Sequence, residues 1–144
     1  MKKVFLSYSH RDEDFKDELK KHLIPLVRMQ EIEIWDDRDI QAGDYWDDEI
    51  NNALESADIV LLLISTDFIA STYCYEKELE RSMERVKEGT CRVIPVIIRT
   101  CKWERLPLGK LQALPKNGKA ISEWANRDVA YTYVAQKVYE VVDQ

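Results

Sequence analysis

The most apolar segment of the sequence, Asp58-Ile-Val-Leu-Leu-Leu-Ile-Ser65, constrains the fold more than any other. A short, continuous apolar run is typical of a parallel β-strand that is covered on both faces. A polar loop follows this run, and then an amphipathic helix that carries Glu76, Glu78 and Glu80. In open α/β sheets, ligands bind beyond the carboxyl ends of the strands. We therefore expect one of these glutamates to stand beside a ligand crevice.

The rest of the chain repeats this alternation of strand and helix. Strands are predicted at 4–8, 32–35, 58–65, 92–98 and 120–124, with amphipathic helices after the first three and at the end of the chain. Pro25 is expected to kink or end the first helix near Ile24, and Pro95 to place its strand at a sheet edge or a bulge. The order predicts an α/β fold with a parallel sheet covered by helices on both faces.

Length and charge limit the function classes. The chain of 144 residues contains no internal repeat or linker, so residues 1–144 are expected to form a single domain, either complete or excised from a longer protein. The formal net charge of −6 argues against a nucleic-acid partner, because such proteins usually present a basic face. No apolar run of membrane-spanning length and no signal-peptide pattern occurs, so no membrane association is expected.

Cysteine and histidine usage predicts neither a disulfide framework nor a metal centre. Cys74, Cys91 and Cys101 are odd in number and scattered, which favours a reducing, cytoplasmic location. His10 and His22 lack the spacing of a zinc site, so no metal is expected.

Several enzyme classes are excluded because their motifs are absent: the P-loop, the dinucleotide-binding glycine fingerprint and the G-x-S-x-G elbow. The acidic positions of a phosphoryl-accepting receiver are also missing. What remains is a set of carboxylates beside aromatic residues, a mixture that suits a nucleoside or sugar ligand. Each of these residues taken alone also fits a solvated loop or a core position. An ideal helical wheel places Glu76 and Glu78 on opposite sides of the apolar stripe and cannot choose between them.

Five motifs in register resemble TIR (Toll/interleukin-1 receptor) domains of the bacterial type. They are Val4-Phe-Leu-Ser-Tyr-Ser-His-Arg-Asp12, Trp35-Asp-Asp-Arg-Asp-Ile-Gln-Ala-Gly43, Ser71-Thr-Tyr-Cys-Tyr-Glu-Lys-Glu-Leu79, Val93-Ile-Pro-Val-Ile97 and Leu111-Gln-Ala-Leu-Pro115. The resemblance implies a flavodoxin-like, three-layer fold with a five-stranded parallel sheet.

The resemblance implies one of two functions. Many TIR domains are NAD+ nucleosidases that cleave the nicotinamide–ribose bond, giving nicotinamide and ADP-ribose or a cyclic variant. Their activity follows TIR–TIR assembly, in settings such as antiphage defence or effector signalling. Others are non-catalytic adaptors that signal through homotypic contacts. The catalytic glutamate of the family matches Glu78, which Leu79 follows. The family's tryptophan four residues earlier is Cys74 here, so ring stacking must come from a neighbour such as Tyr73 or Tyr75.

The resemblance also implies the surroundings of this glutamate. The residues expected to border the substrate are Ser9, Asp36, Arg38, Gly43, Trp46, Cys74 and Tyr75. The residues expected in a self-association loop are Asp37, Asp39, Ile40, Ala42 and Gly43. The expected partners are NAD+ and other TIR domains, with no cofactor beyond NAD+ as substrate and no metal. Because nicotinamide leaves NAD+ without protonation, Glu78 needs only to be ionised at pH 7 to stabilise an oxocarbenium-like ribose.

Overall fold

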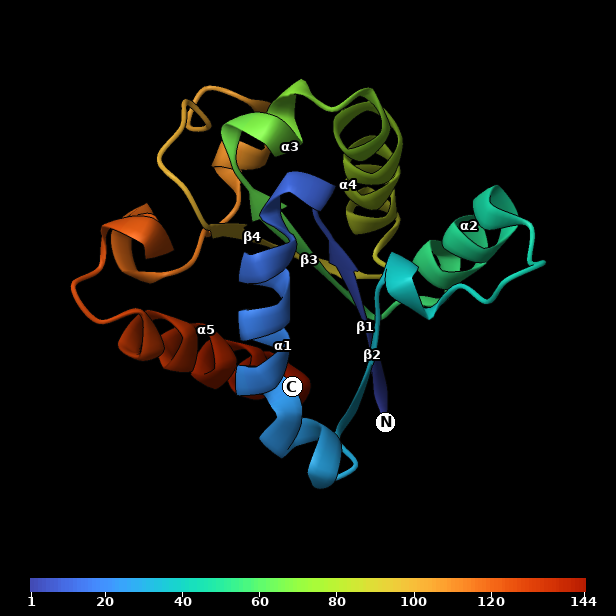
Figure 1. Cartoon of the computed structure of the whole chain (residues 1–144), viewed down its shortest axis with the longest axis horizontal. Helices are drawn as coiled ribbons and strands as arrows, with labels where there is room; N and C mark the ends of the chain where they lie inside the picture. The colour runs from blue at the N-terminus through green and yellow to red at the C-terminus, as the bar shows by residue number, and fades with distance from the viewer.

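The computed structural model describes all residues from Met1 to Gln144 and shows a parallel sheet between two layers of helices (Figure 1). The sheet has four strands, in the order β2-β1-β3-β4, and every neighbouring pair is parallel. The strands are β1 (Lys2–Ser7), β2 (Ile32–Trp35), β3 (Ile59–Ile64) and β4 (Arg92–Ile97). All residues of β3 are buried, as its continuous apolar sequence predicts.

Side chains from successive strand residues enter two separate cores. On one face of the sheet, Leu61 and Leu63 pack with helices α1 (Glu13–Arg28) and α5 (Arg127–Val142). On the other face, Val60, Leu62 and Ile64 belong to the core that also contains residues of α2 (Trp46–Ser56), α3 (Thr66–Ala70) and the segment that follows it. Helix α4 (Glu80–Glu88) completes this layer and ends at Gly89, whose backbone is left-handed. The predicted three-layer arrangement is therefore confirmed.

The prediction of a fifth strand is wrong. Residues Ile121–Glu123 form a 3-10 turn, closed by hydrogen bonds from Glu123 N to Ala120 O and from Trp124 N to Ile121 O. Only Ser122 N continues the pairing, through one hydrogen bond to Ile98 O. Two further short 3-10 turns, Pro107–Lys110 and Lys116–Gly118, lie in the preceding irregular stretch.

The two internal prolines have different outcomes. Helix α1 does not end before Pro25 but continues to Arg28, because Leu26 is buried in the core and Met29 N closes the last turn on Pro25 O. Pro95 lies in β4, which is an edge strand, as the missing amide donor predicts. Here Leu114 N donates to Pro95 O, so an irregular segment covers part of this edge.

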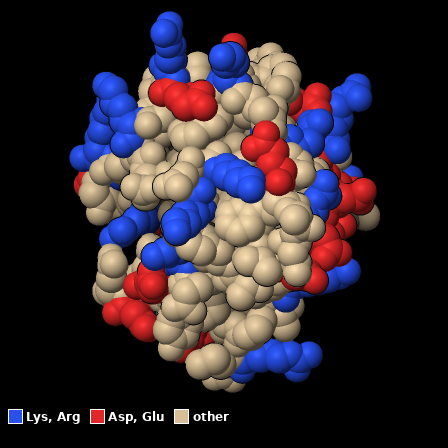
Figure 2. Space-filling view, turned by 90° about the vertical axis from the view of Figure 1, so that its left-hand side faces the viewer, with Lys and Arg blue, Asp and Glu red and all other residues tan.

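The surface is mixed in charge where Figure 2 shows it. On the side that carries the chain between β4 and α5, basic and acidic side chains are interspersed around uncharged areas. The net negative charge of the sequence does not produce a single-sign field on this face. None of the helices is both long and apolar enough to cross a membrane.

Candidate active site

The glutamate that the structure withdraws from water is Glu78. Its exposed fraction is 7%, whereas Glu76 and Glu80 are exposed. The polar loop predicted after the third strand contains the short helix α3. The single helix predicted to follow this loop is in fact two segments, a π-helix over residues Thr72–Leu79 and then α4. A π-helix bonds residue i to residue i+5 and so changes the direction in which side chains point. This change of phase explains why an ideal helical wheel could not select Glu78.

The Glu78 carboxyl group lies against the carboxyl end of β1. Ser7 Oγ donates a hydrogen bond of 2.5 Å to Glu78 Oε1. Burial raises the pKa of Glu78 to about 7, the Ser7 hydrogen bond opposes this rise, and the negative charge of Asp37 adds to it. At neutral pH the ionised and neutral forms of Glu78 are therefore present in similar amounts, whereas an unperturbed glutamate would be almost fully ionised.

A cleft of about 230 Å³ opens in front of this carboxyl group. It lies where β1, β2 and β3 end, which is the position expected for a ligand site in an open α/β sheet. No lysine or arginine is among its lining residues, which are Tyr8, Ser9, His10, Asp37, Trp46, Ile50, Ser71, Tyr73, Cys74 and Glu78. Its volume is suited to one ring and a sugar rather than to a whole dinucleotide.

Asp37 joins the loop after β2 to this cleft. It begins the 3-10 turn Asp37–Asp39, and its Oδ1 accepts a hydrogen bond of 2.6 Å from Tyr8 Oη. Its Oδ2 contacts His10 Nε2. Burial and the nearby Asp37 carboxylate raise the pKa of Tyr8, so this phenol stays protonated as the donor. Asp37 is thus a second carboxylate in the cleft, in addition to its expected place in a self-association loop.

Aromatic rings also line the cleft. Trp46, at the start of α2, is 44% exposed, and its ring centroid lies 4.8 Å from that of Tyr73 at an interplanar angle of 47°. Cys74, which also lines the cleft, is buried, and its Sγ donates to Tyr8 O at 3.3 Å. Burial and the charge of Glu78 raise the pKa of the Cys74 thiol to about 12, so it remains neutral.

Ser9, Trp46, Cys74 and Glu78 are thus brought together in the cleft, whereas the other residues expected at the substrate lie outside it. Asp36 is fully buried between Lys20 and Lys16, at 2.9 and 3.5 Å. Burial by itself would raise the pKa of Asp36, but hydrogen bonds from Lys20 and from the Arg38 amide lower it below its usual value. Asp36 therefore anchors the loop from beneath.

The other residues expected at the substrate, Arg38, Tyr75 and Gly43, do not line the cleft either. The Arg38 guanidinium forms two hydrogen bonds with the Glu13 carboxylate, at 2.5 and 3.0 Å. Tyr75 packs against the core formed by α2, α3 and the sheet. Gly43 has a φ of +93° with open space around it.

The loop expected to mediate self-association is anchored at its start and exposed at its tip. Asp39 accepts a hydrogen bond of 3.0 Å from Asp36 N, which closes the turn, and Ile40 packs against the core. Ala42 and Gly43 are exposed, as are all residues from 41 to 48. The tip is therefore accessible to another molecule.

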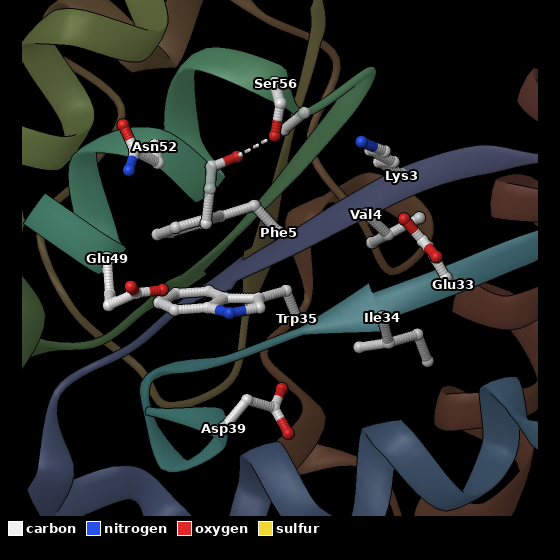
Figure 3. Close-up of a pocket in the computed structure, with 12 residues that line it drawn as sticks. Lys3, Val4, Phe5, Glu33, Ile34, Trp35, Asp39, Glu49, Asn52 and Ser56 are labelled. Atoms are coloured by element: carbon white, nitrogen blue, oxygen red, sulfur yellow. Dashed lines mark hydrogen bonds between the residues drawn. The ribbon is translucent and has the colours of Figure 1, made fainter. Parts of the chain in front are cut away.

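A larger cavity of about 390 Å³ lies between α2 and the strands β1 and β2 (Figure 3). Its floor contains the stacked rings of Phe5 and Trp35, with centroids 5.1 Å apart, and Asp39, Glu49 and Asn52 lie around it. None of the ionisable side chains around it, Lys3, Glu33, Asp39 and Glu49, is buried. The smaller cleft is the better candidate site, because burial and a charge partner perturb the pKa of Glu78 there.

Sequence reasoning did not assign Ser7, Tyr8, His10 or Ser71 to the site, and it named Tyr73 only as an alternative to Tyr75 for ring stacking. Ser7, Tyr8 and His10 lie at or just beyond the carboxyl end of β1, which was the signal available for them. The direction of Tyr73 depends on the π-helix, for which the sequence gives no rule. No group of three or more His, Cys, Asp or Glu side chains has an arrangement that could hold a metal ion.

Comparison with known proteins identifies similar chains. The family model described as TIR domain matches residues 4–130. The chain is 48% identical over 140 residues to the uncharacterized protein y4lF of Sinorhizobium fredii, a match that covers 97% of this chain and 43% of that protein. The chain thus spans less than half the length of this curated relative.

Among solved structures, the TIR domain of the Toll-related receptor TRR-2 from Hydra magnipapillata matches over the whole of both chains, with a TM-score of 0.71 and 19% identity. The TIR domains of the activated Roq1 resistosome match over 70% of this chain and 60% of that chain, with a TM-score of 0.50 and 24% identity. At these identities the likeness shows a shared fold.

Proposed function

The chain belongs to the TIR domain family, and from that premise we propose that it is an NAD+ nucleosidase that cleaves the nicotinamide–ribose bond. The observation that carries the proposal is the buried carboxyl group of Glu78, which faces a cleft with aromatic walls. Family members include enzymes and adaptors, so membership alone does not decide between them. A carboxyl group held away from water with a raised pKa is costly to the fold and is characteristic of functional sites.

The cleft favours a ligand that carries a positive charge on a planar ring. Glu78 and Asp37 supply two carboxyl groups, and Trp46 and Tyr73 supply aromatic surfaces that attract cations. The pyridinium of NAD+ is such a ring. The diphosphate would lie outside the cleft, whose lining contains no lysine or arginine.

The reaction follows from this arrangement. The bond between ribose C1′ and the pyridinium nitrogen breaks, its electron pair neutralises the ring, and nicotinamide leaves. The ribose becomes an oxocarbenium-like cation, which the ionised Glu78 carboxylate stabilises. Attack by water on C1′, with loss of a proton, gives ADP-ribose, whereas attack by a nitrogen of the adenine gives a cyclic product. Only the ionised fraction of Glu78 is competent, so activity rises with pH through about 7.

We further propose that assembly regulates this site through the loop after β2. TIR domains commonly self-associate. In this chain the same loop carries Asp37 into the cleft and exposes Ala42 and Gly43 at its tip. A second copy that contacts the tip can thus change the position of Asp37.

A non-catalytic adaptor is the second candidate. The observation that favours it is Cys74 in place of the family's tryptophan, together with the contact between the Trp46 and Tyr73 rings, which leaves no space for a substrate ring between them. An adaptor would keep the exposed loop and the fold without turnover.

Chromatographic analysis of NAD+ incubated with the purified chain, over a range of protein concentrations, distinguishes the two candidates. We expect nicotinamide and ADP-ribose or a cyclic variant to appear, with a rate per molecule that increases with protein concentration. A Glu78→Ala preparation, purified identically, corrects for contaminating enzymes. The absence of NAD+ loss at every concentration, including with a crowding agent, would favour the adaptor.

A further inference from the structure

Two residues that line the cleft come from positions five residues apart in one helix. Tyr73 and Glu78 both line the cleft. In an α-helix, five steps of about 100° place two side chains about 140° apart, on different sides of the axis. An ordinary helix that began at Ser71 would therefore present either Glu78 or Tyr73 to the cleft, but not both.

The π-helix removes this conflict. Residues Thr72–Leu79 have the wider π-turn, in which residues five apart are neighbours along one face. Side chains hold both ends of the segment. At its start, Ser71 Oγ accepts from Cys74 N at 3.1 Å, and at its end, Ser82 Oγ donates to Glu78 O at 2.6 Å. Single π-turns inside helices occur frequently at functional sites.

The neighbours of Tyr73 cannot take its place. Cys74 has a short side chain whose thiol already donates to the Tyr8 carbonyl. Tyr75 packs against the core and does not line the cleft. Tyr73 is the one aromatic residue of the π-helix that lies in the cleft, and its ring is in contact with that of Trp46.

We propose that Tyr73, supported by Trp46, is the specificity-determining residue that binds the pyridinium ring of the substrate, and that the π-helix is the feature that turns it into the cleft beside Glu78. The inference rests on the proposed function and names the ring-binding residue of that site. Because the two rings already touch, with centroids 4.8 Å apart, the substrate ring packs against this pair rather than between its members. Lys77 Nζ lies 5.4 Å from the centroid of the Tyr73 ring.

Substitution of the ring tests the proposal. The readouts are the KM and kcat for NAD+, and the NAD+ affinity of the same substitutions placed in a Glu78→Gln background, measured by calorimetry. We expect Tyr73→Ala to weaken NAD+ binding about tenfold or more, because the stacking surface is lost. Tyr73→Phe and Tyr73→Trp should bind within a few-fold of the parent, because they retain a ring. Tyr133→Ala, which removes a half-buried ring of α5 outside both the cleft and the loop after β2, is the control.

Deletion of Glu76 tests the register. The deletion leaves Tyr73 and Glu78 four residues apart, a spacing at which an ordinary α-helix places two side chains on the same face. We therefore expect a folded protein that no longer needs the π-helix and still binds NAD+. A deletion variant that is unfolded in a thermal melt, or folded without NAD+ binding, overturns the register argument.

The outcomes separate this inference from the proposed function. Wild-type protein that neither binds nor cleaves NAD+ defeats the proposed function. Wild-type protein that cleaves NAD+, with Tyr73→Ala unchanged or with the loss in Tyr75→Ala instead, defeats the assignment of Tyr73 alone.

Discussion

At the scale of single residues, burial of the Glu78 carboxyl group costs the folded chain free energy whenever this group is ionised. A carboxyl group with an exposed fraction of 7% and one hydroxyl donor, Ser7, has lost most of the water that would stabilise its charge. The neighbouring Asp37 adds like-charge repulsion. The ionised form that the proposed reaction needs is therefore the form that the folded chain disfavours.

This cost predicts a stabilising substitution. The pKa of Glu78 rises from 4.5 in a model compound to about 7 in the folded chain. The neutral side chain is the form that the fold accepts, so the stability that it contributes is fully present below about pH 4.5 and is lost as pH rises through 7, where the buried group ionises. Glu78→Gln removes this penalty and should raise the free energy of unfolding by about 3 kcal/mol at pH 8. Urea titrations of the wild type and of Glu78→Gln at pH 8 and pH 4.5 measure this difference in the free energy of unfolding. An equal gain at both pH values would show that the gain does not come from the ionisation of Glu78.

Two substitutions should move the pH dependence of NAD+ cleavage in opposite directions. Ser7→Ala removes a hydrogen bond to the charged form of Glu78, so its pKa and the midpoint of activity should rise. Asp37→Asn removes a nearby negative charge, so the midpoint should fall. Initial rates between pH 5 and pH 9 give both midpoints. Shifts in the same direction would show that another group controls the profile.

Some of these residue roles could be predicted from the sequence and others could not. The carboxyl ends of parallel strands indicated where a ligand site would lie. The family resemblance, and not this rule, selected Ser9, Trp46, Cys74 and Glu78, which do line the cleft there. The sequence does not show which of two adjacent aspartates after β2 points inward. Asp36 is buried against two lysines, and it is Asp37 that faces the cleft.

At the scale of elements, the pattern of strands and helices was predictable except where local hydrogen bonding overrode it. The apolar runs and helical stripes identified four strands and the main helices. The π-helix was missed because its apolar positions fit an α-helical stripe equally well. The predicted strand at 120–124 became a 3-10 turn because its amides bond within the turn rather than to β4.

The junction of α2 and α4 depends on one buried cation. Arg85 donates to the carbonyl oxygens of Leu54, Ala57 and Thr90, at 2.7, 2.8 and 2.8 Å. It thereby caps the carboxyl-terminal end of α2. Arg85→Met should lower the free energy of unfolding by about 3 kcal/mol, because buried carbonyls lose their donors. Arg81→Met, which removes solvent-exposed ion pairs with Glu55 and Glu84, should have a much smaller effect in urea titration.

At the scale of the whole molecule, the proposed assembly loop and the cleft are parts of one structure. The loop is anchored by Asp36 beneath the surface, reaches the cleft through Asp37 and is exposed from residue 41 to residue 48. A contact between two chains at the loop tip can therefore affect Glu78 through the same loop, because this loop also carries Asp37. This arrangement gives a physical route by which self-association could control turnover.

Two matched glycines test the role of the loop tip. Gly43 and Gly89 both have positive φ, +93° and +75°, with no atom within 4 Å of an added Cβ. An alanine at either position should cost about 1 kcal/mol of stability. We expect only Gly43→Ala to weaken self-association in sedimentation velocity and to lower the concentration-dependent part of NAD+ cleavage. Equal effects of the two substitutions on association would argue against a role for the loop.

The most direct test of the central claim compares two glutamates of the same π-helix. Release of nicotinamide from NAD+ is measured at pH 8 for the wild type, Glu78→Gln and Glu76→Gln, at a protein concentration that permits assembly. Loss of the buried carboxylate should reduce the rate by about 10² to 10⁴, the range for a positioned catalytic group. The exposed Glu76 should be replaceable with little change. Full turnover by folded Glu78→Gln would contradict the account.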